Sequence, residues 1–200
     1  MTLMPVFDFV GTIAFAVLGA MAGIYKKLDV FGVVLLALAT AVGGGIMRDV
    51  VISNTPPMAF RDPTYVIVGI GSAFLAMMLR GLCERFAFII QVCDAIGLGS
   101  FTAAGANTAM VCGQGSLITV IFLAVVTAVG GGVIRDVLIQ QLSSVLYKEI
   151  YATASLAGAV VFYIVYQYFS AATAMYICFF VTTGLRLLAL KYHWNLPVVQ

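Results

Sequence analysis

Apolar runs long enough to cross a lipid bilayer recur along almost the whole of this chain. A helix needs roughly 20 residues to span a hydrocarbon core of about 30 Å. Only 9% of the residues are charged, against roughly 25% in a soluble domain. The runs are continuously apolar, whereas strands of a membrane β-barrel alternate between apolar and polar residues. The sequence therefore predicts a polytopic membrane protein built from helices.

The predicted architecture is all-α, a single transmembrane domain over residues 1–200 with about seven helices. The expected spans are 5–25, 30–54, 63–82, 86–112, 116–141, 148–168 and 171–190. The gaps between them are short and leave no room for a soluble domain.

Basic residues predict how the helices are oriented. One side of the membrane is expected to hold Lys26, Lys27, Arg80, Arg85, Lys148, Arg186 and Lys191, whereas the loops of the other side hold only Arg61. The positive-inside rule then predicts a multi-pass protein of the cell (inner) membrane, with the N-terminus outside and the C-terminus cytoplasmic. Because its positive charges follow the first span instead of preceding it, that span is expected to be a retained helix and not a signal peptide.

The sequence contains an internal duplication. The segment TAVGGGIMRDVVI from Thr40 recurs as TAVGGGVIRDVLI from Thr127, and DFVGTIAFAVLGA from Asp8 matches DAIGLGSFTAAGA from Asp94. These matches define repeat one over 5–82 and repeat two over 86–168. Because each repeat holds three spans, the second is expected to enter the membrane inverted, with 171–190 as an unpaired seventh helix.

Each repeat carries three consecutive glycines in its second span. The two triplets are Gly43, Gly44 and Gly45, and Gly130, Gly131 and Gly132. A glycine within a helix costs about 1 kcal/mol relative to alanine, so the triplets predict either a break or kink beside an aqueous cavity, or an unusually close helix contact. The break is favoured because packing glycines are usually three or four residues apart, as Gly19 and Gly23 are.

An Arg-Asp pair follows each triplet, at Arg48-Asp49 and at Arg135-Asp136. A charge at the bilayer centre costs at least about 2.5 kcal/mol, so these groups should pair or face water. Neighbouring residues on a helix point about 100° apart, so each arginine is expected to meet an acid on another helix. Asp8 and Asp94, at the heads of the first and fourth spans, are the natural partners. These pairs could serve transport or only lock the repeats together.

Polar side chains also occur in the spans that we expect to line a path: Thr12, Thr40, Ser100, Thr102, Asn107, Thr108 and Thr127. Such groups can replace part of an ion's hydration. Alternatively, hydroxyls bond their own helix backbone and contribute nothing to conduction.

The doubled GGG-x-x-RD segment, the three-plus-three-plus-one span pattern and the length resemble the prokaryotic members of the trimeric intracellular cation channel family. That family overlaps bacterial proteins described as glycine transporters. The resemblance implies a homotrimer whose protomers each hold an hourglass-shaped pore for monovalent cations, chiefly potassium. It places pore kinks at the two glycine triplets, with Arg48, Asp49, Arg135 and Asp136 beside them. Membrane lipids, transient potassium ions and other copies of the chain are the partners it implies.

Two functions stay open on the residues alone. A channel needs a continuous water path with weak sites, whereas a secondary transporter of a small solute such as glycine needs a closed site and alternating access. The few ionisable groups inside the spans occur as paired motifs and form no strong substrate pocket, which favours the channel. A structural or lipid-organising protein would leave the doubled Arg-Asp motif unexplained.

The sequence lacks the residue arrangements that enzymatic catalysis requires. His193, the only histidine, follows the last span, so no Ser-His-Asp arrangement can form inside the bundle. Cys83, Cys93, Cys112 and Cys178 show no metal-binding spacing. We expect no metal site, no cofactor and, with a net charge of +2, no nucleic-acid partner.

Overall fold

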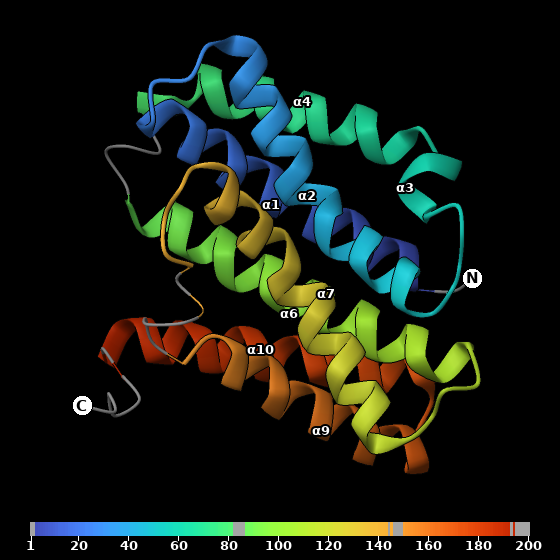
Figure 1. Ribbon diagram of the computed structural model, residues 1–200. Coiled ribbons are helices and arrows are strands. Elements are labelled where there is room, and N and C mark those ends of the chain that lie inside the picture. Colours follow the sequence, from blue (N-terminus) through green and yellow to red (C-terminus); the bar gives the residue numbers. More distant parts are fainter. Residues whose placement is uncertain (1–2, 82–86, 144, 146–149, 193, 195–200) are drawn as a thin grey trace.

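The computed structural model describes residues 3–81, 87–143, 145, 150–192 and 194. The helices of these ranges are α1 (Met4–Tyr25), α2 (Val30–Val51), α3 (Met58–Arg61), α4 (Thr64–Met78), α6 (Ala87–Val111), α7 (Leu117–Leu138), α9 (Ala152–Tyr168) and α10 (Ala171–Tyr192) (Figure 1). Cys83, Arg85, Lys148 and His193 lie outside the described residues.

The helices occupy the places of the predicted spans. Five of them, α1, α2, α6, α7 and α10, are long and apolar enough to cross a membrane, whereas α4 and α9 are apolar but only 15 and 17 residues long. The chain is therefore an all-helical polytopic membrane protein, as predicted. The predicted span 30–54 is too long by three residues, because Ser53 has a positive φ of 58° that does not continue a right-handed helix.

Matching positions of the two halves use the same local devices to begin and end their second long helix. Asp29 precedes α2 and accepts a hydrogen bond from the Gly32 N–H at 2.7 Å. Ser116 precedes α7 and accepts one from the Thr119 N–H at 3.2 Å. A side-chain acceptor at this position satisfies a donor that the first helical turn leaves unpaired. After α7, Gln140 adopts a positive φ of 53°, as Ser53 does after α2.

The glycine triplets meet where α2 and α7 cross. A β-carbon added to Gly44 would collide with the backbone carbonyl of Thr127, and one added to Gly131 would collide with the carbonyl of Thr40. Residue 40 of α2 thus contacts residue 131 of α7, and residue 44 contacts residue 127. Because the numbers rise in one helix as they fall in the other, the two helices cross antiparallel. Small residues permit such an approach of two helix backbones.

Both helices remain α-helical through the triplets, since α2 continues to Val51 and α7 to Leu138. The expectation of an unwound or broken helix is therefore wrong, and the close-packing alternative describes what is found. The reason is that each triplet presents its bare backbone to the other helix, and the resulting packing offsets the low helix propensity of glycine. A bend within a continuous helix, as the resemblance implies, stays a prediction.

The first helices of the two repeats also cross antiparallel. Gly11 of α1 faces the ring of Phe101, and Gly97 of α6 faces the ring of Phe15. The two rings meet edge to face, with centroids 5.1 Å apart, and each is almost completely buried. The centre of the bundle is therefore apolar and closely packed.

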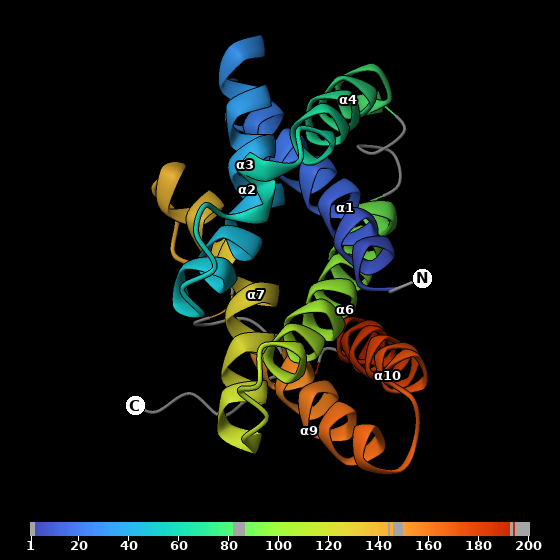
Figure 2. The ribbon, with the colours of Figure 1, turned by 90° about the vertical axis from the view of Figure 1, so that its right-hand side faces the viewer.

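The remaining helices cover this four-helix centre. Figure 2 shows α4 beside α1 at one end of the molecule, with α9 and α10 beside α6 at the other. Helix α10 packs against both α6 and α9, whereas repeat one has no helix in the corresponding place among the described residues.

Candidate functional site

The first Arg-Asp site consists of Asp8, Arg48 and Asp49. Arg48 lies in the last turn of α2, and its Nη1 donates to Asp8 Oδ1 of α1 at 3.0 Å and to Oδ2 at 3.3 Å. Its Nε donates to Asp49 Oδ1 at 2.9 Å. The guanidinium thus joins two carboxylates, and all three side chains are at most 5% exposed. The predicted pairing of Arg48 with Asp8 is confirmed.

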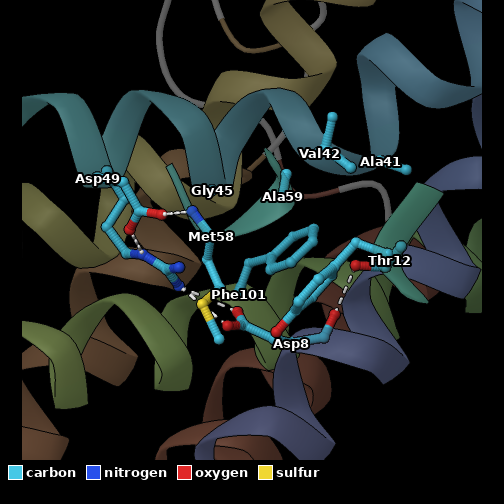
Figure 3. A pocket seen from close by; sticks show the side chains of 11 residues that line it. Asp8, Thr12, Ala41, Val42, Gly45, Asp49, Met58, Ala59 and Phe101 are labelled. Carbon is cyan, nitrogen blue, oxygen red and sulfur yellow. Dashed lines mark hydrogen bonds and ion pairs between the residues drawn. The ribbon is translucent and has the colours of Figure 1, made fainter. Parts of the chain in front are cut away.

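Asp49 also ties the loop after α2 to the site. Its Oδ2 accepts a hydrogen bond from the Met58 N–H at 2.8 Å, at the start of α3 (Figure 3). Buried carboxylates are stable only when they are paired and hydrogen-bonded. Each carboxylate of this site meets that requirement through protein atoms.

A small cavity lies beside this site, and we name it the first mouth. It has a volume of about 20 Å³, room for about one water molecule. Figure 3 shows Asp8, Thr12, Asp49 and Phe101 around it, and Gly45 of the first triplet also lines it. The cavity beside the first Arg-Asp site is therefore nearly closed.

The second Arg-Asp site consists of Asp94, Arg135 and Asp136, and its pairing differs. Arg135 donates through Nε to its own neighbour, Asp136 Oδ1, at 2.9 Å, and its Nη2 lies 2.8 Å from the same atom. Among the described ion pairs, Asp94 is joined to Arg186 of α10 instead, with Nη2 and Oδ2 3.2 Å apart. The expectation that Asp94 is the ion-pair partner of Arg135 is therefore wrong. A helix outside the repeat supplies the counter-charge.

A larger cavity, the vestibule, opens beside the second site. Its volume is about 650 Å³. The residues that line it are Leu18, Met21, Ala22, Tyr25, Lys26, Ile90, Arg135, Asp136, Ile139 and Gln141. The Arg135 side chain is 16% exposed, against 3% for Arg48. Two nearly identical sequence motifs thus lie in different surroundings, one sealed and one open.

Two site residues were missed by the sequence reasoning. The sequence places Arg186 among the cytoplasmic positive charges, but its position inside the predicted span 171–190 is a signal that it is buried and paired. Tyr151 donates its hydroxyl proton to Asp94 Oδ1 at 3.1 Å. A tyrosine in an apolar sequence carries no comparable signal.

The threonines of the expected path bond their own helices. Thr12, Thr40, Thr102, Thr108 and Thr127 each donate a hydroxyl hydrogen bond to the carbonyl four residues earlier, at 2.6–2.8 Å. This is the alternative in which hydroxyls satisfy the local backbone. Among the described residues, no group of three or more His, Cys, Asp or Glu could hold a metal ion.

The profile of the family described as "Glycine transporter" matches the sequence twice, over residues 5–81 and 91–167. The chain belongs to this family. A relative, the UPF0126 inner membrane protein YadS of Escherichia coli (strain K12), is 38% identical over 193 residues, which are 95% of this chain and 93% of the relative.

Solved structures show the same fold in channels. The structure described as "Structural basis for conductance through TRIC cation channels" matches with a TM-score of 0.92 and 32% identity, over 100% of this chain and 98% of that one. The TRIC trimeric intracellular cation channel orthologue from Rhodobacter sphaeroides matches with a TM-score of 0.91 and 31% identity, over 97% and 100%. The resemblance to the TRIC family is confirmed, and none of these three relatives is described as an enzyme.

Proposed function

We propose that this member of the glycine transporter family is a potassium-permeable channel for monovalent cations, with a path inside each protomer of a homotrimer. The observation that carries the proposal is the likeness to TRIC cation channel structures over the whole chain, at 31–32% identity. Membrane lipids surround the assembly, and potassium ions pass through it without a resident metal site.

The two cavities support a path along α1. Asp8 and Thr12 line the first mouth, and Leu18 and Met21 line the vestibule. Phe15 lies between them in the helix and is 1% exposed. The path is therefore shut at its centre in this structure, and conduction requires the packing around Phe15 to open. The first Arg-Asp site holds two carboxylates against one guanidinium, an excess of negative charge that favours entry of a cation.

The proposed architecture is an inverted three-plus-three repeat with a seventh helix, in which α4 and α9 also span the membrane. The double match of the family profile supports the duplication. The antiparallel contacts of α2 with α7 and of α1 with α6 support the inversion. Each contact from repeat one to repeat two has a matching contact from repeat two to repeat one, as a two-fold axis between inverted repeats requires. The basic residues support an inner-membrane protein with its N-terminus outside and its C-terminus in the cytoplasm.

A glycine transporter is the second candidate, because the family profile carries that description. A carrier with this fold would bind its solute between the two cavities and open them alternately. The cavity beside one Arg-Asp site is nearly closed and the cavity beside the other is large, an asymmetry that alternating access also uses.

The test uses purified protein in planar bilayers and in liposomes. Across a tenfold KCl gradient, we expect unitary currents that reverse near the potassium potential, about 60 mV at 25 °C. Labelled glycine uptake into the same liposomes is expected to equal that of protein-free liposomes. Saturable glycine uptake without unitary currents would contradict the proposed channel and support the carrier. A reversal potential near that of chloride would contradict cation selectivity.

A further inference from the structure

The acids Asp8 of α1 and Asp94 of α6 match in sequence but are held by different helices. Asp8 of α1 is paired with Arg48 of α2, within repeat one. Asp94 of α6 is paired with Arg186 of α10, which lies outside both repeats. The seventh helix therefore takes over, in one repeat only, an ion pair that the other repeat makes internally.

Several contacts hold Arg186 in this position. Its Nε donates to Asp94 Oδ2 at 3.2 Å, and its guanidinium lies over the Tyr151 ring, 4.8 Å from the centroid. A guanidinium at this distance from an aromatic face is attracted by the ring. Tyr151 donates in turn to the other oxygen of Asp94. The three side chains form one connected cluster.

Arg135 has a different position from its counterpart Arg48. It lies on the vestibule wall and donates only to Asp136 among the described hydrogen-bond acceptors. Helices α6 and α7 pack together as α1 and α2 do. In repeat one the matching arginine, Arg48, reaches the matching acid, Asp8, at 3.0 Å. Arg135 is therefore the residue expected to take the Asp94 carboxylate when Arg186 no longer occupies it.

We infer that Arg186 is a positioning residue: by holding Asp94, it keeps Arg135 on the vestibule wall and keeps this end of the protein open. Without Arg186, Arg135 joins Asp94 to Asp136 in the way that Arg48 joins Asp8 to Asp49, and the vestibule contracts toward the sealed form of the first mouth. That this positioning by Arg186 controls ion flow rests on the proposed channel function. The exchange of one guanidinium for another at a single carboxylate is a two-state equilibrium that a substitution can shift.

The test measures access to the vestibule directly. All four cysteines are replaced by alanine, and Ala22→Cys places one thiol on the vestibule wall. Its rate of modification by a cationic methanethiosulfonate reagent is followed by mass spectrometry on protein in liposomes. Ala59→Cys, in the wall of the first mouth, is the matched control and is expected to react slowly in every variant. Arg186→Gln is expected to slow the Ala22→Cys reaction about tenfold, within the range of ordinary coupling between sites.

Asp94→Asn separates this inference from a merely structural ion pair. A structural pair predicts that Arg186→Gln and Asp94→Asn have the same effect, because each breaks the same bond. We expect Asp94→Asn to leave the vestibule as reactive as the parent, because Arg135 then has no second carboxylate to join. For the same reason, Arg186→Gln combined with Asp94→Asn is expected to restore the fast reaction, and Arg186→Lys is expected to keep it.

An unchanged rate in Arg186→Gln would overturn the inference, as would a double variant that reacts as slowly as Arg186→Gln. If Arg186→Gln does not fold, the Asp94→Asn variant still decides, since slow modification there contradicts the inference and fast modification supports it. Potassium flux through the same proteins is recorded separately. The expected thiol reactivities in a protein that passes no current would leave the positioning role standing and reject only the proposed channel.

Discussion

Gly44→Ala destabilises the bundle by about 1–3 kcal/mol or more, the usual cost of overpacking, whereas Gly45→Ala, one residue later, has little effect. The β-carbon at residue 44 would fall on the backbone carbonyl of Thr127, which can move only if the two helices separate. At residue 45, the new β-carbon would lie 3.9 Å from Arg48 Nη2, an ordinary van der Waals contact. Alanine there also removes the poor helix propensity of glycine.

The second repeat offers the same comparison. Gly131→Ala would meet the carbonyl of Thr40, whereas the new β-carbon of Gly132→Ala would lie 3.9 Å from Arg135 Nη2, an ordinary van der Waals contact. Thermal unfolding midpoints of the four variants in detergent, beside that of the parent, provide the measurement. Equal midpoints for the two members of either pair would contradict the crossing of α2 and α7 through their glycine backbones.

Arg48→Gln is expected to destabilise the protein by about 3–5 kcal/mol, because it leaves the buried carboxylates of Asp8 and Asp49 without their counter-charge. Arg135→Gln is expected to cost clearly less, because the Arg135 side chain is 16% exposed on the vestibule and joins a single carboxylate, that of Asp136. Chemical denaturation or thermal unfolding of the two variants under the same conditions measures the difference.

The control for this pair removes all the charges of the first site together. Arg48→Gln combined with Asp8→Asn and Asp49→Asn keeps the shapes of the side chains and is expected to regain most of the lost stability, since no uncompensated charge remains buried. Similar losses for Arg48→Gln and Arg135→Gln would show that the two sites are equally sealed, against the arrangement described above.

Residues with a strong local or compositional signal were predicted well. The helices α1, α2, α6, α7 and α10 follow from apolar length, and the partnership of Asp8 with Arg48 followed from the cost of a lone charge in lipid. The glycine triplets indicated that α2 and α7 are unusual helices, but they did not decide between a broken helix and a close helix contact. A row of glycines weakens a helix and also lets a second backbone approach, and only the presence of the Thr127 carbonyl beside Gly44 decides between these effects.

The sequence by itself determined that this chain is a bundle of membrane helices built from a duplicated unit, because apolar length and a repeated motif are local properties of the chain. Only the tertiary structure decided that Arg186 is the partner of Asp94, and that Arg135 is partly exposed where Arg48 is buried. The physical reason is that α10 packs on α6 of the second repeat. An almost identical motif is thereby given a different neighbour, through a contact between residues 92 positions apart.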